Sequence, residues 1–86
     1  MTVKFHALSS APRLAASKFK ISAAQPFATV VRSLRRKLRL GDAESVFCYV
    51  GSCFAPGLDE AVGNLWRCFQ VGGELVVGYA VARSFG

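Results

Sequence analysis

Residues 26–41 have the sequence PFATVVRSLRRKLRLG, and this stretch decides the fold. Its apolar side chains recur at the spacing of one face of an α-helix: Phe27, Val30, Val31, Leu34 and Leu38. Pro26 suits a first helical turn, because the N–H that proline lacks has no intrahelical partner there. Gly41 is expected to take the left-handed conformation that ends a helix. The stretch therefore predicts an amphipathic helix with one buried stripe.

Basic side chains occupy much of the rest of this helix. They are Arg32, Arg35, Arg36, Lys37 and Arg39. Residues 1–41 contain nine Lys or Arg and no acid, whereas residues 42–86 contain two Arg and five acids, within a net charge of +6. Such polarity suits a nucleic acid, an anionic membrane or an acidic protein as a partner, although a basic helical face is usually just solvated.

Two strand patterns precede the helix. Residues 2–8 and residues 17–21 alternate apolar and polar side chains, which is the period of a half-buried strand. Pro12 and its neighbours read as a turn between them. An antiparallel hairpin is the simplest pairing for two such strands.

Two more strands follow the helix. Residues 45–50 are β-branched and aromatic, and residues 74–82 form an apolar run after the turn at Gly72 and Gly73. Between these strands, an edge strand could form near residues 52–55, and Asp59 or Glu60 is expected to begin a short second helix. The predicted order is two strands, a helix, a strand, a short helix and a strand.

This order predicts an α+β fold of the ubiquitin-like β-grasp type. The sheet would be mixed, with four to five strands, one long helix across one face and a short second helix. The crossover through the long helix could make the second and third strands parallel neighbours. A ferredoxin-like half or an RNA-binding α+β domain shares much of the order. We expect a domain over residues 1–82 and a flexible C-terminal tail over residues 83–86.

The sequence offers no catalytic set and no metal site. The cysteines are Cys48, Cys53 and Cys68, an odd number without a CxxC pair, so free thiols are expected rather than a disulfide scaffold or a zinc site. The one histidine, His6, lies in an alternating strand pattern and has no nucleophile beside it in the sequence. No apolar run approaches the roughly 20 residues of a membrane span.

Two stretches of the sequence indicate a particular protein family, and not only a fold class. Residues 46–56, VFCYVGSCFAP, and residues 62–69, VGNLWRCF, resemble the family of autophagy-related protein twelve. The tripeptide Phe54-Ala55-Pro56 of that family is intact here, although Cys53 stands where serine is common. The sequence ends in Ser84-Phe85-Gly86, with Phe85 where tryptophan is usual. The resemblance covers nearly the whole chain.

The resemblance implies a ubiquitin-like modifier and not an enzyme. An activating enzyme would use ATP on the carboxylate of Gly86, and no cofactor would be bound by the chain itself. Thioester transfer to conjugating enzymes, including the lipid-transferring one, would end in an isopeptide bond to a lysine of autophagy-related protein five. That conjugate would promote lipidation of the second autophagy modifier, in the cytoplasm and at the forming autophagosome membrane, with only indirect membrane contact.

The resemblance also nominates site residues. Phe85 would anchor the tail in an enzyme cleft, and the partner-binding residues would be Phe54, Tyr49, Arg36 and Lys37. For Phe54 and Tyr49 the alternative is that both rings pack in the core. A glycine without a Cβ suits the reacting position, because a thiolate or an amine can approach its carbonyl closely.

Two other functions remain open from the sequence. One is the lipid-conjugated autophagy modifier or a generic ubiquitin-like domain. The other is a small basic RNA-binding module, which would need aromatic and basic side chains interleaved on one sheet face. The concentration of Arg and Lys on the helix argues against the RNA-binding module, and no nucleic-acid partner is expected.

Overall fold

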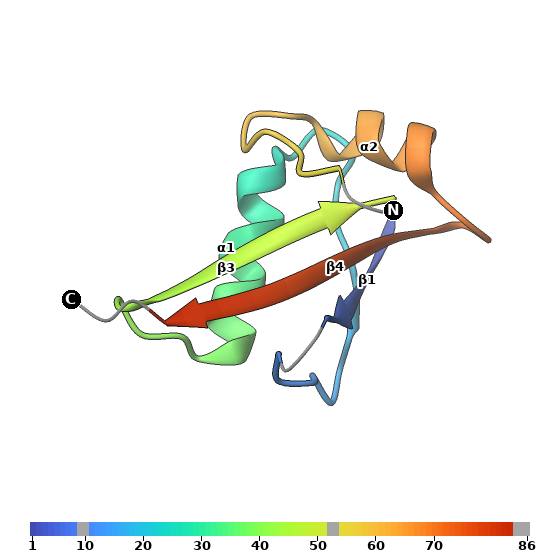
Figure 1. Ribbon diagram of the computed structural model, residues 1–86. Helices are drawn as coiled ribbons and strands as arrows, with labels where there is room; N and C mark the ends of the chain where they lie inside the picture. Colours follow the sequence, from blue (N-terminus) through green and yellow to red (C-terminus); the bar gives the residue numbers. More distant parts are fainter. Residues whose placement is uncertain (9–10, 52–53, 84–86) are drawn as a thin grey trace.

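The computed structural model describes residues 1–8, 11–51 and 54–83. The elements follow the predicted order: β1 (Thr2–Ala7), β2 (Lys18–Lys20), α1 (Phe27–Leu38), β3 (Glu44–Val50), α2 (Val62–Phe69) and β4 (Glu74–Arg83). The four strands form one mixed sheet, with α1 packed across one face and α2 at one end (Figure 1). This is the β-grasp arrangement that the sequence predicted.

The strand order in the sheet is β2-β1-β4-β3. β1 and β2 pair antiparallel, as expected for the hairpin, while β1 pairs parallel with β4 and β3 pairs antiparallel with β4. The prediction that the second and third strands are parallel neighbours is wrong, since β2 and β3 lie at opposite edges of the sheet. The reason is that β4, the longest strand, enters between β1 and β3 and pairs along both of its edges.

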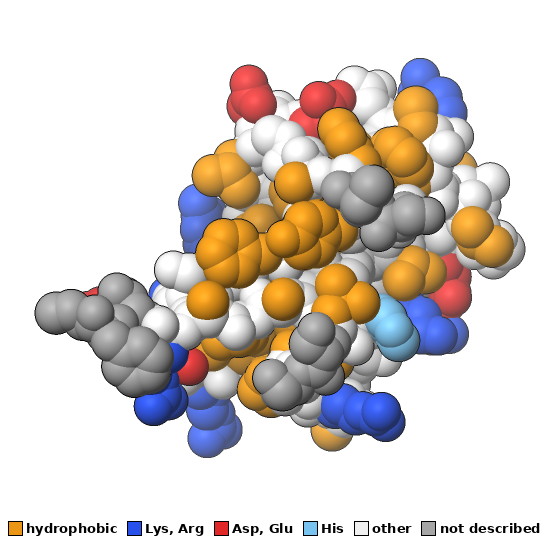
Figure 2. Space-filling view, in the orientation of Figure 1, with side chains coloured by type: hydrophobic (Ala, Val, Ile, Leu, Met, Phe, Trp, Pro, Cys, Tyr) orange, Lys and Arg blue, Asp and Glu red, His pale blue; other side chains and the backbone are white. Residues whose placement is uncertain are grey.

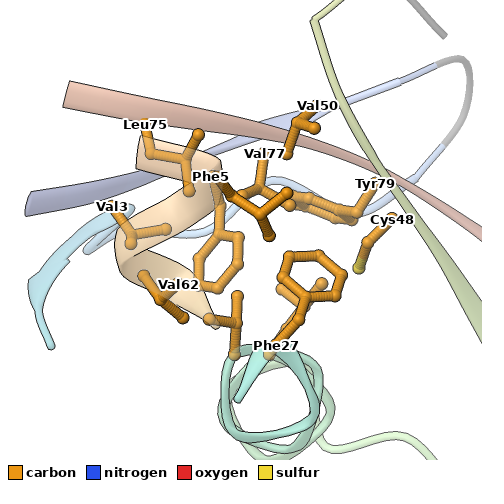
Figure 3. Packing of buried hydrophobic residues seen from close by; sticks show 12 residues of the cluster. Val3, Phe5, Phe27, Cys48, Val50, Val62, Leu75, Val77 and Tyr79 are labelled. Carbon is orange, nitrogen blue, oxygen red and sulfur yellow. The ribbon is translucent and has the colours of Figure 1, made fainter. Parts of the chain in front are cut away.

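The core lies between the sheet and α1. Buried side chains come from the inward face of β1, β3 and β4, from the predicted stripe of α1 and from α2: Val3, Phe5, Phe27, Val30, Leu34, Cys48, Val50, Val62, Leu65, Leu75, Val77 and Tyr79. Figure 3 shows Phe5, Val77 and Tyr79 directed from the sheet toward Phe27 at the start of α1. Burying these rings and branched chains supplies the main driving force for the fold, at roughly 1.5 to 3 kcal/mol for each large side chain.

The end of α1 differs from the expectation. The left-handed residue is Arg39 (φ 56°, ψ 45°), which follows the last helical residue, Leu38. Gly41 does not have a positive φ. The side chain of Arg35 holds the turn instead, because its guanidinium donates to the carbonyl oxygens of Glu44 (2.9 Å) and Gly41 (3.1 Å). The prediction that Gly41 ends the helix is therefore wrong.

The strand ends also differ in detail. Within the predicted edge strand 52–55, Ser52 and Cys53 lie outside the described residues, and Phe54 makes only an isolated bridge with Val50. β4 includes Arg83, opposite Glu44, although residue 83 was expected to begin the tail. The rest of the predicted tail, residues 84–86, lies outside the described residues.

The start of α2 is fixed to the segment that precedes α1. The backbone N–H of Val62 donates to the carbonyl of Gln25, and that of Gly63 donates to the carbonyl of Ala23, both at 2.9 Å. These bonds satisfy two of the donors that a helix leaves free at its first turn. In the part of the chain that the structure describes, neither helix has the length and hydrophobicity needed to cross a bilayer.

Candidate partner-binding surface

The face of the sheet that points away from α1 carries exposed apolar side chains. Successive strand residues point to opposite faces, so the neighbours of buried Cys48, Val50 and Val77 must point outward. Figure 2 shows hydrophobic side chains gathered over β3 and β4 on this face, with Lys and Arg around its rim. We call this surface the outer face of the sheet.

Phe54 lies beside this face rather than in the core. Its side chain is 48% exposed, and its ring stacks on that of Phe69 with the centroids 5.6 Å apart. Two backbone hydrogen bonds with Val50 hold Phe54 at the end of β3. A half-exposed aromatic ring on a fixed backbone can be covered by a partner without reordering the chain, which favours the partner-binding prediction over the core alternative.

Tyr49 is half-buried on the outer face. It lies opposite Gly78 of β4, and Gly78 in turn lies opposite His6 of β1. The absence of a side chain at Gly78 leaves room for Leu8, whose Cδ1 would come within 3.1 Å of a Cβ placed there. Tyr49 therefore borders a shallow apolar area and is only partly available to a partner.

Two exposed apolar residues of the outer face were not predicted from the sequence. They are Phe47, opposite Ala80 and 48% exposed, and Val76, which is 39% exposed. The signal was present in the alternation of residues 44–50, which places Phe47 on the same side as Tyr49 and opposite to Cys48. Phe47, Tyr49 and Val76 form an apolar patch on the outer face, of the kind that marks interaction sites, whereas Phe54 lies at the sheet edge beside Phe69.

The β1–β2 half of the outer face is basic. Lys4, Lys18 and Lys20 alternate with the core-facing residues of β1 and β2. Lys18 forms an ion pair with Glu74, with the Nζ and Oε2 atoms 2.7 Å apart, and this contact lowers the pKa of the Glu74 carboxyl. Basic side chains thus lie on this half of the sheet as well as on α1, where the sequence predicted their concentration.

The structure does not bring Arg36 and Lys37 together with Phe54 and Tyr49. Both basic residues are exposed on α1, which covers the inward face of the sheet, so they belong to the other side of the molecule. The Nζ atom of Lys37 lies 5.8 Å from the centroid of the Phe19 ring, a cation–π contact within the chain. The predicted partner-binding residues therefore divide between two separate surfaces.

The predicted reacting residue Gly86 and the predicted anchor Phe85 lie outside the described residues. The last described residue, Arg83, is held to Glu44 by a backbone pairing and by an ion contact of 4.0 Å. Among residues 1–8, 11–51 and 54–83, no three His, Cys, Asp or Glu side chains come close enough together to hold a metal ion.

Sequence comparisons identify the relatives of this chain. It matches, over residues 1–86, the family model described as ubiquitin-like autophagy protein Apg12. It is 58% identical over 86 residues to the ubiquitin-like protein ATG12 of Coccidioides immitis, covering 100% of this chain and 47% of that protein. It is 57% identical over 86 residues to the protein of the same name from Aspergillus fumigatus, covering 100% and 49%. The chain thus spans about half the length of these relatives.

A comparison of structures supports the fold. The chain superposes on the crystal structure of Trypanosoma brucei ATG8 with a TM-score of 0.86, covering 100% of this chain and 76% of that one. The two sequences are 17% identical, so the likeness concerns the fold alone. The ubiquitin-like β-grasp is confirmed.

Proposed function

Because this chain belongs to the Apg12 family of ubiquitin-like autophagy proteins, we propose that it is a protein modifier joined to another protein through the carboxyl group of Gly86. The acceptor is a lysine of autophagy-related protein five. The conjugate then promotes lipidation of the second autophagy modifier as the autophagosome forms. The observation that carries this proposal is the family match over residues 1–86 of a chain with the ubiquitin-like fold.

The proposal makes this chain a substrate of enzymes and not an enzyme. An activating enzyme joins the Gly86 carboxylate to the AMP part of ATP and releases pyrophosphate. Its cysteine thiolate then displaces AMP to form a thioester, and the cysteine of a conjugating enzyme takes over the acyl group by thiol exchange. The ε-amine of the acceptor lysine then attacks the thioester carbonyl, the thiolate leaves, and an isopeptide bond remains. Gly86 suits this transfer because it has no Cβ to obstruct the attacking group, and Phe85 provides an apolar anchor beside it.

The outer face supplies the contacts that such a modifier needs. Phe54 and Tyr49 bind a conjugation partner through exposed or half-exposed aromatic area, and Phe47 adds a third ring beside Tyr49 on the outer face. Arg36 and Lys37 lie on the opposite side and provide a second, charged contact to the lipid-transferring enzyme or to another partner. The protein reaches the membrane only through the conjugate, from the cytoplasm.

Reconstitution tests the proposal. The chain is mixed with the activating enzyme, the conjugating enzyme, autophagy-related protein five and ATP. We expect a hydroxylamine-sensitive thioester first and then a stable adduct of the two proteins. Both products should be absent for a variant that lacks Gly86, because the carboxyl group would then belong to Phe85, whose side chain crowds the carbonyl.

A glycine variant remote from the tail serves as the control. Gly41→Ala changes an exposed turn residue with no heavy atom closer than 3.9 Å to the added Cβ, so it should conjugate like the unaltered chain. If the variant without Gly86 forms the adduct equally well, the proposal fails.

A further inference from the structure

The outer edge of β3 is a free edge of the sheet. The backbone N–H and C=O of Val50 bond to Phe54, at 2.8 and 3.1 Å, and the C=O of Glu44 accepts from Arg35 at 2.9 Å. Both residues therefore turn these groups away from β4. Because this direction repeats every two residues in an antiparallel ladder, Val46 and Cys48 turn their backbone groups the same way. Among the described residues, no hydrogen-bond partner is found for them.

An apolar cavity of about 180 Å³ opens beside this edge. It lies between α1, β3 and the segment that crosses from β3 back to α1, and it is lined by Phe27, Val31, Val46, Phe47, Cys48, Tyr49, Ala55, Pro56 and Leu58. Its volume is below the roughly 300 Å³ at which pockets for whole small molecules begin. It is suited instead to a single apolar side chain.

Arginine residues lie next to the cavity. Arg35 follows Phe27 and Val31 on the same row of α1 at a spacing of four residues, and exposed Arg32 lies one row further from the sheet. The residues that line the cavity include no acid. The Arg35 guanidinium already donates to the carbonyl oxygens of Glu44 and Gly41, so exposed Arg32 is the cation that can meet a carboxylate at this end of the groove.

We propose that this groove binds an extended acidic peptide, which adds to β3 as a further strand. Its backbone would pair with Val46 and Cys48, one apolar side chain would fill the cavity, and a carboxylate would face Arg32. A second copy of this chain is the less suitable occupant, because each copy carries a net charge of +6 and its own arginines beside the edge. The inference goes beyond the proposed function, since binding requires neither activation nor conjugation.

The test uses the unconjugated chain and an octapeptide of alternating isoleucine and glutamate as the probe. In amide NMR spectra we expect the largest shifts at Val46 and Cys48. Methylating the backbone nitrogens of one alternate set of peptide residues should abolish binding, whereas methylating the other set should leave it unchanged. This difference arises because only one set donates to β3.

Charge reversal provides the matched variants. Arg32→Glu should weaken binding of the octapeptide roughly three- to tenfold, whereas Arg67→Glu, the same change on α2, should leave the affinity unchanged. No binding at millimolar peptide would overturn the proposal, and so would equal effects of the two methylated sets or of the two variants. Shifts confined to β1 and β2 would also overturn it. A dimer that forms without peptide and shifts the amide signals of Val46 and Cys48 would also overturn it. The occupant of the β3 edge would then be a second copy of this chain.

Discussion

Gly63 lies where the start of α2 crosses the segment that precedes α1. A Cβ at this position would come within 2.9 Å of the Cβ of Ala23 and 3.1 Å of its carbonyl oxygen. The same carbonyl accepts the hydrogen bond from the N–H of Gly63 at 2.9 Å, so the two backbones cannot move apart without losing it. Glycine is therefore required at position 63, within the stretch 62–69, because two chain segments approach closely there.

Gly63→Ala should accordingly destabilise the protein. The steric overlap of the added Cβ with Ala23 destabilises the fold by more than the higher helix propensity of alanine stabilises it. We therefore expect a net loss of roughly 1 to 2 kcal/mol in the free energy of unfolding. Urea unfolding followed by circular dichroism measures it. Gly41→Ala is the control, with an expected change within about 0.5 kcal/mol. A Gly63→Ala variant as stable as the control would show that the contact with Ala23 relaxes freely.

Cys48 and Cys68 differ in environment. Cys68 is exposed, whereas Cys48 is buried, and its burial raises the pKa of the thiol from 9.0 to about 11. Since the thiolate is the reacting form, Cys48 should be alkylated by iodoacetamide at pH 8 at least about a hundredfold more slowly than an ordinary thiol. Its rate should rise with pH up to about pH 11. Tandem mass spectrometry of the peptides assigns each modified residue, because Cys53 lies only five residues from Cys48 and no Lys or Arg separates them.

Concentrated urea is the control for this measurement, because unfolding exposes both thiols and should equalise their rates. Equal rates for Cys48 and Cys68 in the folded protein would contradict the burial of Cys48.

At the scale of the element, α1 shows what local pattern can and cannot predict. Its buried stripe follows from the spacing of Phe27, Val30 and Leu34, and those three residues are buried in the structure. Its end does not follow from local preference, because glycine favours the left-handed conformation and Arg39 nevertheless adopts it. The hydrogen bonds of Arg35 to Gly41 and Glu44 fix the turn, and such contacts across the connection to β3 leave no periodic signal.

Arg39→Gly should therefore stabilise the protein. The left-handed conformation costs a side chain with a Cβ roughly 1 kcal/mol, and glycine removes that cost at the price of a more flexible unfolded chain. We expect a net gain of about 0.5 kcal/mol in the free energy of unfolding. Arg36→Gly, the same change inside α1, should instead lose about 1 kcal/mol. Thermal unfolding of both variants checks the sign, and a loss in both would contradict the account of Arg39.

The outer face of the sheet gives a prediction about function. Phe54→Ala should reduce conjugate-dependent lipidation severalfold, because it removes a partner-binding ring that is 48% exposed. Its cost in unfolding free energy should remain near 1 kcal/mol, since the lost contact is one stacked pair with Phe69. Val71→Ala, at a residue that is 74% exposed, is the control and should change neither quantity. Unimpaired lipidation by Phe54→Ala would exclude this ring as a partner contact.

Only part of the candidate site could be predicted from the sequence. Aromatic rings after and within β3 were recognisable as candidates, but the exposure of Phe54 depends on its support by Phe69, fifteen residues further on. The sequence also could not predict that Arg36 and Lys37 lie on a different side of the molecule from the aromatic rings of Phe54 and Tyr49. This separation depends on which face of the sheet α1 covers, and that is a property of the assembled fold.

At the scale of the whole molecule, strand order was the feature that sequence pattern did not determine. Each strand and both helices were recognisable because periodicity is local. The position of β4 between β1 and β3 depends on contacts between the two ends of the domain, such as Val3 with Leu75 and Phe5 with Val77. The parallel pairing of β1 and β4 unites the hairpin and β3 in one sheet. The antiparallel pairing with β3 extends β4 to Arg83, three residues before Gly86 in the sequence.

The central claim is that Gly86 is the reacting residue of a protein modifier, and identification of the covalent bond tests it most directly. The adduct formed in the reconstituted reaction is digested and analysed by tandem mass spectrometry. We predict a branched peptide in which the carboxyl carbon of Gly86 is joined to a lysine ε-nitrogen of autophagy-related protein five, stable to reducing agent and hydroxylamine. An adduct joined through any other residue of this chain, or no covalent adduct, would contradict the account.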